Sequence, residues 1–324
     1  MPYSEAPAVW VLADDRTGDV AQCMGVAEAL GWPFAVKSIA YERLGILHNV
    51  LRGPTLVGVS PDSRAGLAPP WPRLVIGCGR RTVPIARWIK RRSGCFLTQI
   101  MDPGIGSRAD IDLLAVPSHD ACRLPEARAV RILGAPHRVT PRRLAAAAAH
   151  WRPHLAHLPR PWLAVIVGGA TRRRDFPQDL ARQLGRDVSA MASAAGGSVL
   201  LTTSRRTGRA AERILLSAIE PPRYIHRWGQ GGDNPFMAMI ALADAVVVTG
   251  ESTSMCTEAT LCRGPVHIWS PSGWAAPKHV RLHRDLFAGG YARPFEDWTG
   301  FAADGHAPLN PAAAIAAAIR ERLR

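Results

Sequence analysis

Short apolar runs that end in glycine or polar loops, with helical patterns between them, constrain the fold of this chain more than any other feature. AVWVLA at 8–13 ends in a polar loop, and the stretch 20–31 that follows has helical periodicity and ends in glycine. RLVIGCG at 73–79 repeats the pattern before a helical stretch at 80–94. Strands that alternate with helices predict parallel sheets with helical crossovers. We therefore expect an α/β protein.

The alternation forms two series, which predicts two doubly wound, Rossmann-like domains facing a cleft. The expected strands lie at 8–13, 73–79, 96–103, 112–120 and 127–139 in the first series, and at 162–169, 198–204, 223–228, 244–250 and 265–271 in the second. Residues 141–161 predict a helix broken by prolines, which we interpret as the linker. In such sheets ligands bind beyond the carboxyl ends of the strands, so the loops there are candidate sites.

The charge balance narrows the classes of partner. The chain has 324 residues and carries 40 Lys and Arg against 26 Asp and Glu, a formal net charge of +14. This surplus favours phosphorylated substrates, anionic membranes or nucleic acid. Arginine inflated by a GC-rich genome and solvated on the surface is the alternative. Nucleic acid is disfavoured, because the basic loops carry Gly, Ser and Thr instead of aromatic residues that stack on bases.

The cysteines and the chain start bear on location. The six cysteines form no CxxC pair and no cluster with histidine at zinc spacing, so we expect reduced thiols and no metal. The first residues lack the basic region and apolar core of a signal peptide. No apolar run reaches about 18 residues, the length that crosses a bilayer. We expect a cytoplasmic protein.

The first polar loop, DDRTGDVAQ at 14–22, offers two candidate general bases. Asp15 and Asp19 flank Gly18, a residue that permits a tight turn. A positioned carboxylate can take a proton from a reacting hydroxyl. The alternative is an N-cap aspartate followed by a plain turn, and the residues alone do not decide between the two.

The second loop, GCGRRT at 77–82, offers Gly79 and Arg80 to a phosphate. It lacks the full GxGxxG fingerprint and the acidic residue that would hold a ribose, so dinucleotide binding is disfavoured. Asp102, at the polar end of the strand expected at 96–103, is a further candidate base.

Two loops of the second half carry guanidinium groups directly after strands. GGATRRRDF at 168–176 and TTSRRTG at 202–208 combine glycines, hydroxyls and arginines, which suits a diphosphate. Neither has the Walker pattern, so P-loop hydrolysis of nucleoside triphosphates is disfavoured. A solvated arginine face is the alternative. The candidate phosphate-binding residues are Gly168, Gly169, Thr171, Arg172, Ser204 and Arg205.

The stretch TGESTSMCTE at 249–258 follows the buried run ADAVVV. The hydroxyl groups fall where the next helix must begin, and a carboxylate lies about one turn into that helix, where it can accept hydrogen bonds from two ribose hydroxyls. A plain capping arrangement is the alternative. The candidate binding residues are Thr249, Glu251, Ser252, Ser254, Met255 and Glu258.

These loops resemble those of a known family over roughly residues 9–295. The matching motifs are WVLADDRTGDVAQ, VIGCGRRT, QIMDP, VPSHD, GAPHRV, IVGG, LLTTSRRT and LADAVVVTGESTSMCTEA. They are similar to the mitochondrial fission family founded on the plant elongated-mitochondria protein, whose bacterial members are regarded as glycosyltransferases. One position departs from the family: Asp19 stands where a histidine is usual, which puts the role of that position in doubt.

The resemblance implies a GT-B fold. It implies an acceptor-side domain at 1–150, a domain for the sugar nucleotide at 151–305, and a C-terminal helix within 306–324 that packs back on the first domain. It also implies that Glu258 holds the ribose of the sugar donor. The diphosphate then lies among Gly169, Thr171, Ser204, Arg205, Ser252 and Ser254.

The expected reaction is transfer of a sugar from a nucleoside-diphosphate sugar to a hydroxyl, with inversion as the simplest scheme. Asp19 is the first choice of base, ahead of Asp102 and Asp15, and Arg16 orients the acceptor. Arg172 and Arg205 stabilise the leaving diphosphate. No Asp-x-Asp metal motif lies at a strand end, so we expect neither metal nor cofactor, with the sugar nucleotide as substrate.

A cell-envelope glycolipid such as lipopolysaccharide core is the expected acceptor, because the positive charge suits a phosphorylated lipid at the inner face of the inner membrane. Basic residues of the helix at 80–94 would face the membrane, with a solvated face as the alternative. Two other functions stay open: a non-catalytic membrane adaptor, and a hydrolase or epimerase on the same fold.

Overall fold

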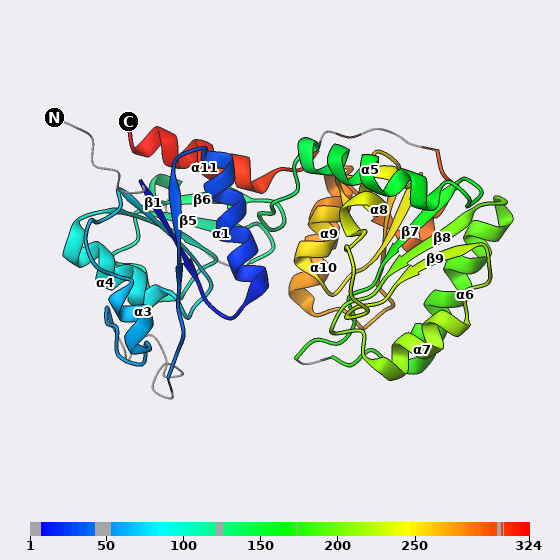
Figure 1. Ribbon diagram of the computed structural model, residues 1–324, viewed down its shortest axis with the longest axis horizontal. Coiled ribbons are helices and arrows are strands. Elements are labelled where there is room, and N and C mark those ends of the chain that lie inside the picture. Colours follow the sequence, from blue (N-terminus) through cyan, green and yellow to red (C-terminus); the bar gives the residue numbers. More distant parts are fainter. Residues whose placement is uncertain (1–7, 43–52, 121–125, 173, 303–305, 307) are drawn as a thin grey trace. The chain divides into compact units, whose positions relative to one another are not determined.

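The computed structural model describes residues 8–42, 53–120, 126–172, 174–302, 306 and 308–324 (Figure 1). Contacts divide the chain into two compact units. Unit 1 comprises Met1–Arg138 and Asn310–Arg324, and unit 2 comprises Val139–Leu309. Each unit contains a six-stranded sheet in which all paired strands are parallel. The predicted α/β class with two doubly wound sheets is confirmed.

The sheet of unit 1 has the order β2-β1-β3-β4-β5-β6. Its strands are β1 (Val9–Ala13), β2 (Phe34–Ser38), β3 (Leu74–Cys78), β4 (Phe96–Ile100), β5 (Leu113–Pro117) and β6 (Ala129–Ile132). Its helices are α1 (Thr17–Leu30), α3 (Pro61–Ala65), α4 (Val83–Ser93) and α11 (Pro311–Arg322), with 3-10 turns η2 (Ile105–Ser107) and η3 (Glu126–Arg128).

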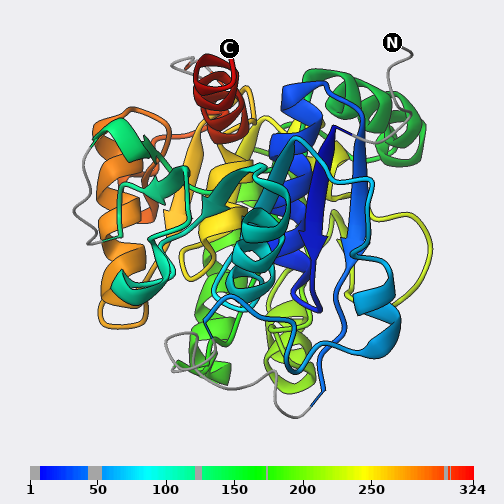
Figure 2. The ribbon, with the colours of Figure 1, turned by 90° about the vertical axis from the view of Figure 1, so that its left-hand side faces the viewer.

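Alternating side chains of the strands fill both faces of this sheet. Val9 and Val11 of β1 join α1 and α11 in one buried cluster, whereas Trp10 and Leu12 join α4 in another. Figures 1 and 2 show α1 and α4 on opposite faces. Strands buried on both faces read as continuous apolar runs, which explains why the sequence reveals them.

The last helix, α11, belongs to unit 1. It packs on α1 and β6, and the guanidinium of Arg320 donates a hydrogen bond of 2.7 Å to the carbonyl oxygen of Ala29. Ile315 and Ile319 are fully buried in the cluster that contains α1. α11 is therefore part of the core of unit 1.

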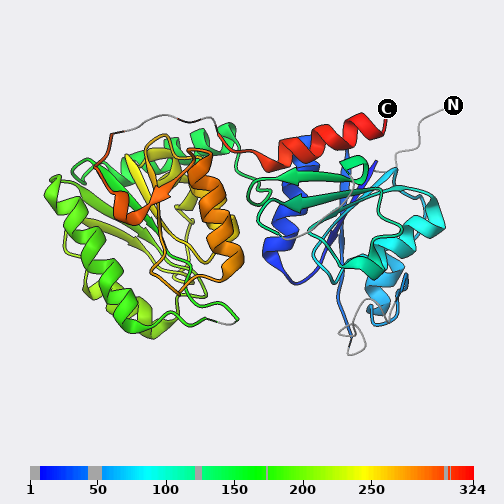
Figure 3. The same cartoon turned by 180° about the vertical axis from the view of Figure 1, so that it is seen from behind.

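The sheet of unit 2 has the order β12-β11-β10-β7-β8-β9. Its strands are β7 (Trp162–Ile166), β8 (Ser198–Thr202), β9 (Arg223–His226), β10 (Ala245–Thr249), β11 (Val266–Trp269) and β12 (Arg293–Pro294). Its helices are α5 (Pro141–Leu155), α6 (Gln178–Ala194), α7 (Arg209–Ser217), α8 (Phe236–Leu242), α9 (Thr253–Ala259) and α10 (Pro277–Ala288), with the 3-10 turn η4 (Phe295–Asp297). Figures 1 and 3 show α6 and α7 on one side of this sheet and α10 on the other.

Residues 141–161, predicted to be a linker with a broken helix, instead contain the continuous helix α5. α5 continues through Pro153, because this proline lies in the last turn, where it removes only one helical hydrogen bond. The boundary expected at residue 150 falls inside α5. The structure instead divides the chain between Arg138 and Val139, because α5 packs against α8 of unit 2.

Four elements were not predicted: β2, α3, α10 and β12. Most positions of β2 are half-exposed or exposed, so it lacks the apolar run that marks the other strands. β12 has two residues and α3 has five, too few for a periodic pattern. Two of the four buried positions of α10 are histidines, His279 and His283, which hide its apolar stripe.

Candidate functional site

The loops of unit 2 diverge between β7 and β10. These neighbouring strands lead in opposite directions, because β7 connects through α6 to β8 and β10 connects through α9 to β11 on the other side. Open parallel sheets bind ligands at such a switch point. Gly168 and Gly169 follow β7 there, and Glu251 follows β10.

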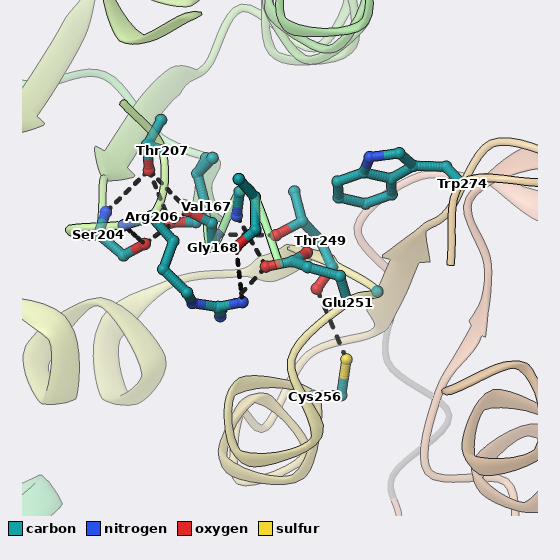
Figure 4. A network of polar contacts seen from close by, with 12 residues as sticks. Val167, Gly168, Ser204, Arg206, Thr207, Thr249, Glu251, Cys256 and Trp274 are labelled. Atoms are coloured by element: carbon teal, nitrogen blue, oxygen red, sulfur yellow. Dashed lines mark hydrogen bonds and ion pairs between the residues drawn. The ribbon is translucent and has the colours of Figure 1, made fainter. Parts of the chain in front are cut away.

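Glu251 occupies the switch point with its own carboxylate (Figure 4). Its side chain is 1% exposed, and Oε1 lies 3.2 Å from Nη2 of Arg206. Oε1 also accepts a hydrogen bond of 2.7 Å from the backbone N–H of Gly169. Oε2 is buried without a hydrogen-bond partner among the described residues. Burial raises the pKa of Glu251, an effect opposed by the charge of Arg206 and by the Gly169 N–H.

The two glycines are required by close approach. A Cβ on Gly168 would lie 1.7 Å from Oε1 of Glu251, and a Cβ on Gly169 would lie 2.4 Å from the carbonyl oxygen of Arg206. The φ of Gly169 is +125°, which favours glycine. The N–H of Gly169, expected to bind a diphosphate, is therefore already bound to Glu251. Arg206, which the sequence reading overlooked, is the arginine that reaches this point.

Two of the hydroxyl groups expected to face a ligand, those of Ser204 and Thr249, belong to this loop network. Ser204 Oγ donates to the carbonyl oxygen of Gly168 at 2.5 Å, and Thr207 Oγ1 donates to the same oxygen at 2.8 Å. The Gly168 N–H donates to Thr249 Oγ1 at 2.8 Å. Figure 4 shows these groups converging around the end of β7. Ser204 and Thr249 thus hold three loops together.

Glu258 is a carboxylate on α9, one turn after Ser254. It is only partly exposed, and its carboxylate makes no hydrogen bond or ion pair with a described residue. Desolvation raises its pKa to about 7. A desolvated, unpaired carboxylate is costly for folding, which makes it a candidate functional group.

The start of α9 differs from a plain capped helix. Ser252 is the N-cap residue, but its side chain makes no capping hydrogen bond. Ser254 and Met255 lie in the first turn and are partly exposed. Glu251 does not cap α9 either, because its Oε1 bonds to Gly169. The hydroxyl of Ser252 is thus not used in capping.

The remaining candidates of unit 2 lie on its surface. Thr171 and Arg174 form a small bridge in the loop after β7. Arg172 and Arg205 are exposed, and neither has an ion-pair partner among the described residues. Both guanidinium groups are available to an anion.

A cavity of about 610 Å³ lies where β8 and β9 end. Its lining consists of Ser204, Arg205, Gly208, Arg209, Glu212, Arg227, Trp228, Gly229 and Gln230. Only Ser204 and Arg205 were predicted. For Arg227, Trp228, Gly229 and Gln230 the signal was the segment HRWGQGG, at the end of the strand predicted at 223–228, by the same carboxyl-end rule that identified the other loops.

Unit 1 has its own switch point between β1 and β3, where Asp19 meets Gly79. A Cβ on Gly79 would lie 2.5 Å from Oδ2 of Asp19, and the φ of this glycine is +69°. Burial and the charge of Asp14 raise the pKa of Asp19, opposed by Arg16 and Arg81. The side chain is 17% exposed, and its distance to Arg16 is 3.9 Å. Asp19 is a carboxylate with a raised pKa and a path to solvent.

Other predictions in unit 1 are revised. Gly18 does not form a tight turn, because it lies in the first turn of α1 without a positive φ. Arg81 bonds to Asp15 and lowers its pKa, which makes Asp15 a weaker base than Asp19. Arg80 is exposed at the end of β3.

Asp102 is held in an ion pair. Nε of Arg108 donates to Oδ1 at 2.8 Å, and Nη2 of Arg108 donates to Oδ2. Oδ1 also accepts from the N–H of Gly104 at 3.0 Å. These bonds stabilise the charged carboxylate and engage both oxygens, so Asp102 is a poorer base than Asp19.

The basic helix expected at the membrane is largely neutralised. Arg87, only 7% exposed, pairs with Asp110 at 2.7 Å, and Arg91 pairs with the same carboxylate at 3.2 Å. Lys90 pairs with Asp112. These side chains of α4 fold onto the loop before β5 and do not present a free cationic face.

Two features of the described chain concern metals and membranes. Its His, Cys, Asp and Glu side chains form no group of three or more that could hold a metal ion. None of its helices has the length and apolar character needed to cross a bilayer.

Comparisons with known proteins place this geometry in context. A family model described as Mitochondrial fission ELM1 matches residues 17–323. An uncharacterized Rickettsia prowazekii protein, RP120, is 26% identical, with 98% of each chain covered. The Arabidopsis thaliana mitochondrial fission protein ELM1 is 28% identical over 78% of this chain, which spans 64% of the plant protein.

Solved structures resemble the whole chain at low identity. MurG of Acinetobacter baumannii has a TM-score of 0.52 at 13% identity, covering 97% of this chain and 100% of MurG. The spinosyn forosaminyltransferase SpnP has a TM-score of 0.54 at 15% identity, with 98% and 94% covered. UDP-GlcNAc 2-epimerase of Neisseria meningitidis, bound to UDP-GlcNAc, has a TM-score of 0.54 at 11% identity, with 97% and 99% covered. The fold is the GT-B fold of glycosyltransferases and these epimerases.

Proposed function

The chain belongs to the mitochondrial fission ELM1 family, and on that premise we propose that it transfers a sugar from a nucleoside-diphosphate sugar to an acceptor hydroxyl. Two observations about the fold support the proposal. The chain has the GT-B architecture of MurG and SpnP, and a neighbour of the same fold is bound to UDP-GlcNAc.

The observation that carries the proposal is the unpaired carboxylate of Glu258. Its pKa is raised to about 7, because desolvation penalises the charged form and no described residue compensates. Two vicinal ribose hydroxyls donating to the carboxylate would provide that compensation. Glu258 therefore binds the ribose of the sugar donor, at a position one turn into α9.

The leaving group needs charge stabilisation, which exposed cations of the same unit supply. Arg172 and Arg205 are free of ion pairs with described residues and take the diphosphate, with Thr171 and the start of α9 at Ser252 as further contacts. Gly169 and Ser204 shape the loops rather than bind phosphate directly, because their polar groups already have partners. No metal enters the scheme.

The base is Asp19. The acceptor oxygen forms a bond to the anomeric carbon, the bond from that carbon to the diphosphate breaks, and the acceptor proton passes to a carboxylate oxygen of Asp19. Its raised pKa makes it a stronger base than Asp15, whose pKa Arg81 lowers, while both oxygens of Asp102 are bound by Arg108. A single displacement of this kind inverts the anomeric centre.

We further propose that the acceptor is a glycolipid of the cell envelope at the cytoplasmic face of the inner membrane. The net charge of +14 supports an anionic acceptor. The ion pairs of α4 remove Arg87, Lys90 and Arg91 from consideration as the membrane contact, so other basic residues must supply it.

A second candidate, epimerisation or hydrolysis of the sugar nucleotide, is favoured by one observation. The Neisseria epimerase resembles this chain with the same TM-score as SpnP, 0.54. This candidate reaction also requires Glu258 to bind the sugar nucleotide, but it needs no acceptor hydroxyl. A non-catalytic membrane adaptor, suggested by the name of the plant relative, needs neither.

A thermal-shift panel tests the proposal. The protein is heated with UDP-, GDP-, ADP- and CMP-sugars, and we expect at least one class to raise the melting temperature, because a ligand that binds only the folded state stabilises it. Glu258→Ala should weaken that ligand by about tenfold or more, since hydrogen bonds to a charged group contribute about 1.5–3 kcal/mol. Glu220→Ala, which removes an exposed carboxylate of the same unit, is the matched control.

Each outcome bears on the choice of function. No shift with any compound would overturn the sugar-nucleotide site and favour the adaptor. A shift that is unchanged in Glu258→Ala would remove the ribose contact. Binding with release of free sugar or a changed epimer, in the absence of acceptor, would favour the epimerase or hydrolase.

A further inference from the structure

Trp228 is set apart from the other tryptophans of the chain. There are ten tryptophans. Nine of them have an aromatic ring or a cation against the indole, and Trp228 alone has neither among the described residues. It is 60% exposed and lines the cavity of about 610 Å³ at the ends of β8 and β9. An indole that faces solvent in a concave site is a surface on which a planar ring can stack.

The backbone of Trp228 is fixed although its side chain is exposed. Its N–H donates to Thr203 Oγ1 at 2.9 Å, and the Thr203 hydroxyl donates to Oε1 of Glu212 at 2.7 Å. Three glycines with positive φ follow closely, at 229, 231 and 232. The chain therefore turns sharply after Trp228 and leaves the indole at the rim of the cavity.

Glu212 anchors the loop from the other side. Its Oε2 accepts two hydrogen bonds from Arg227, from Nε at 2.9 Å and from Nη2 at 2.7 Å. The side chain of Glu212 is 9% exposed. Because both carboxylate oxygens are bound, Glu212 and Arg227 position the loop and are not free for a ligand.

Two cations of the cavity are free. Arg205 and Arg209 are exposed and have no ion-pair partner among the described residues. Ser204 lines the same cavity and bonds to Gly168, so the cavity adjoins the loop at the end of β7. A stacking surface beside free guanidinium groups suits a ligand that combines an aromatic ring with phosphates.

Apart from Arg205 and Arg209, which suit the phosphates, the polar side chains of the lining that could read the edge of such a ring already have partners. Gln230 Oε1 accepts from the N–H of Arg227 at 2.8 Å, and its Nε2 lies 3.2 Å from Nδ1 of His226. Ser204 Oγ donates to Gly168 and accepts from the N–H of Arg206. Hydrogen bonds from side chains are what give strong discrimination between ligands.

We propose that this cavity is the base pocket of the sugar-nucleotide site, in which the nucleobase stacks on Trp228 beside Arg205 and Arg209 and its edge is not read by side chains. This inference rests on the proposed function and extends it to the class of nucleotide. The protein binds nucleoside diphosphates of different bases with similar affinity, because stacking is available to every base.

Titration calorimetry on the full chain with UDP, GDP and ADP tests this pocket, with inorganic pyrophosphate as the probe without a base. We expect dissociation constants of the three nucleotides within about tenfold of one another. Trp228→Ala should weaken each nucleotide by about tenfold or more, on the scale measured for base stacking, and leave pyrophosphate unchanged. Trp228→Phe, which keeps an aromatic ring, should retain most of the affinity.

The outcomes separate this inference from the function on which it rests. If the wild-type protein binds none of the nucleotides, both fall. If it binds them and Trp228→Ala binds them equally well, the base lies elsewhere and only the pocket is wrong. A preference above about a hundredfold for one base would overturn stacking without edge recognition. Melting temperatures of both variants close to that of the wild type show that they fold.

Discussion

The switch points of the two units hold a similar pair in different surroundings. In unit 1, Asp19 lies against Gly79, is 17% exposed and has Arg16 at 3.9 Å. In unit 2, Glu251 lies against Gly168, is 1% exposed, and is bound by Arg206 and the N–H of Gly169. In unit 1 the acid, Asp19, follows β1, the first strand of the sheet, and Gly79 follows β3. In unit 2 the order is reversed: Gly168 follows β7, the first strand, and Glu251 follows β10.

The difference teaches that a carboxylate at a switch point can serve two purposes. Glu251 bridges loops from β7, β8 and β10, and its side chain, only 1% exposed, has little access to solvent. Asp19 has fewer partners, a raised pKa and access to solvent. Unit 2 uses Glu251 to fix the loops, whereas the proposed function assigns Glu258 to the ligand and Asp19 of unit 1 to proton transfer.

The largest expected effect comes from removing the proposed base. Asp19→Asn should lower kcat/KM for sugar transfer by roughly 10²–10⁴-fold, the usual contribution of a general base, with sugar-nucleotide affinity unchanged. The measurement is transfer kinetics beside titration of the nucleotide. Asp15→Asn is the control, because Arg81 already stabilises the charge of Asp15 and makes it a weak base. A greater loss in Asp15→Asn would reverse the roles.

The next effect is a pH dependence that originates in Glu258. Desolvation raises its pKa in the folded protein to about 7, from an ordinary value of 4.5. Because the folded protein binds this proton more tightly than the unfolded chain, the free energy of unfolding is highest below about pH 4.5. It falls as the pH rises to about 7, by roughly 3 kcal/mol at most. Denaturant titrations from pH 4.5 to 7.5 should show this loss in the wild type.

Glu258→Gln is the control for that titration. The glutamine carries no charge, so this component should be absent from its stability profile. The affinity for nucleotide should change with pH in the opposite direction from stability, because ribose hydroxyls favour the charged carboxylate. Affinity should therefore rise with pH up to about 7 in the wild type and stay flat in Glu258→Gln. Identical profiles for both proteins would show that Glu258 does not titrate there.

A smaller effect should follow from filling the glycine of unit 2. Gly168→Ala would place a Cβ 1.7 Å from Oε1 of Glu251, whose side chain cannot move without breaking its bonds to Arg206 and Gly169. We expect the free energy of unfolding to fall by about 1–3 kcal/mol, as for other overpacked sites. Chemical denaturation measures it.

Gly18→Ala serves as the control for this change. A Cβ there meets no described atom within 4 Å, and the residue is helical. The substitution should therefore stabilise the protein by up to about 1 kcal/mol. If Gly168→Ala is also neutral or stabilising, Glu251 does not fix the loop, and the carboxylates of the two switch points are held with similar strength.

The smallest effect concerns the cations around Asp19. Arg81 lowers the pKa of Asp19, so Arg81→Met should raise it and move the acidic limb of the pH–rate profile upward. Because proton transfer itself is intact, the plateau activity should change less than about tenfold. Arg16→Met should shift the limb in the same direction. A downward shift would show that another group controls the profile.

The sequence alone predicted the α/β class, the two sheets and most of the helices and strands. Parallel strands are buried on both faces, so runs such as AVVVT in β10 are recognisable without any partner. The edge strand β2 was not predicted because it lacks this burial. Helix α10 was not predicted because histidines occupy buried positions on its apolar face. Local pattern fails where burial is partial or chemically mixed.

The carboxyl-end rule also located the site loops, since it follows from the direction of the strands. It placed Gly168, Ser204 and Glu251 at one end of the second sheet. It missed Arg206 and the cavity around Trp228, although both lie in loops that the same rule selects.

What only the tertiary structure decided is which polar groups are already satisfied. The chain order does not reveal that Glu251 accepts from the N–H of Gly169 or that Arg108 holds Asp102. Nor does it reveal that Glu258 has no partner in the part of the chain that the structure describes. Periodicity reflects neighbours along one element, whereas these pairings join loops that are far apart in sequence and meet only when the sheets form.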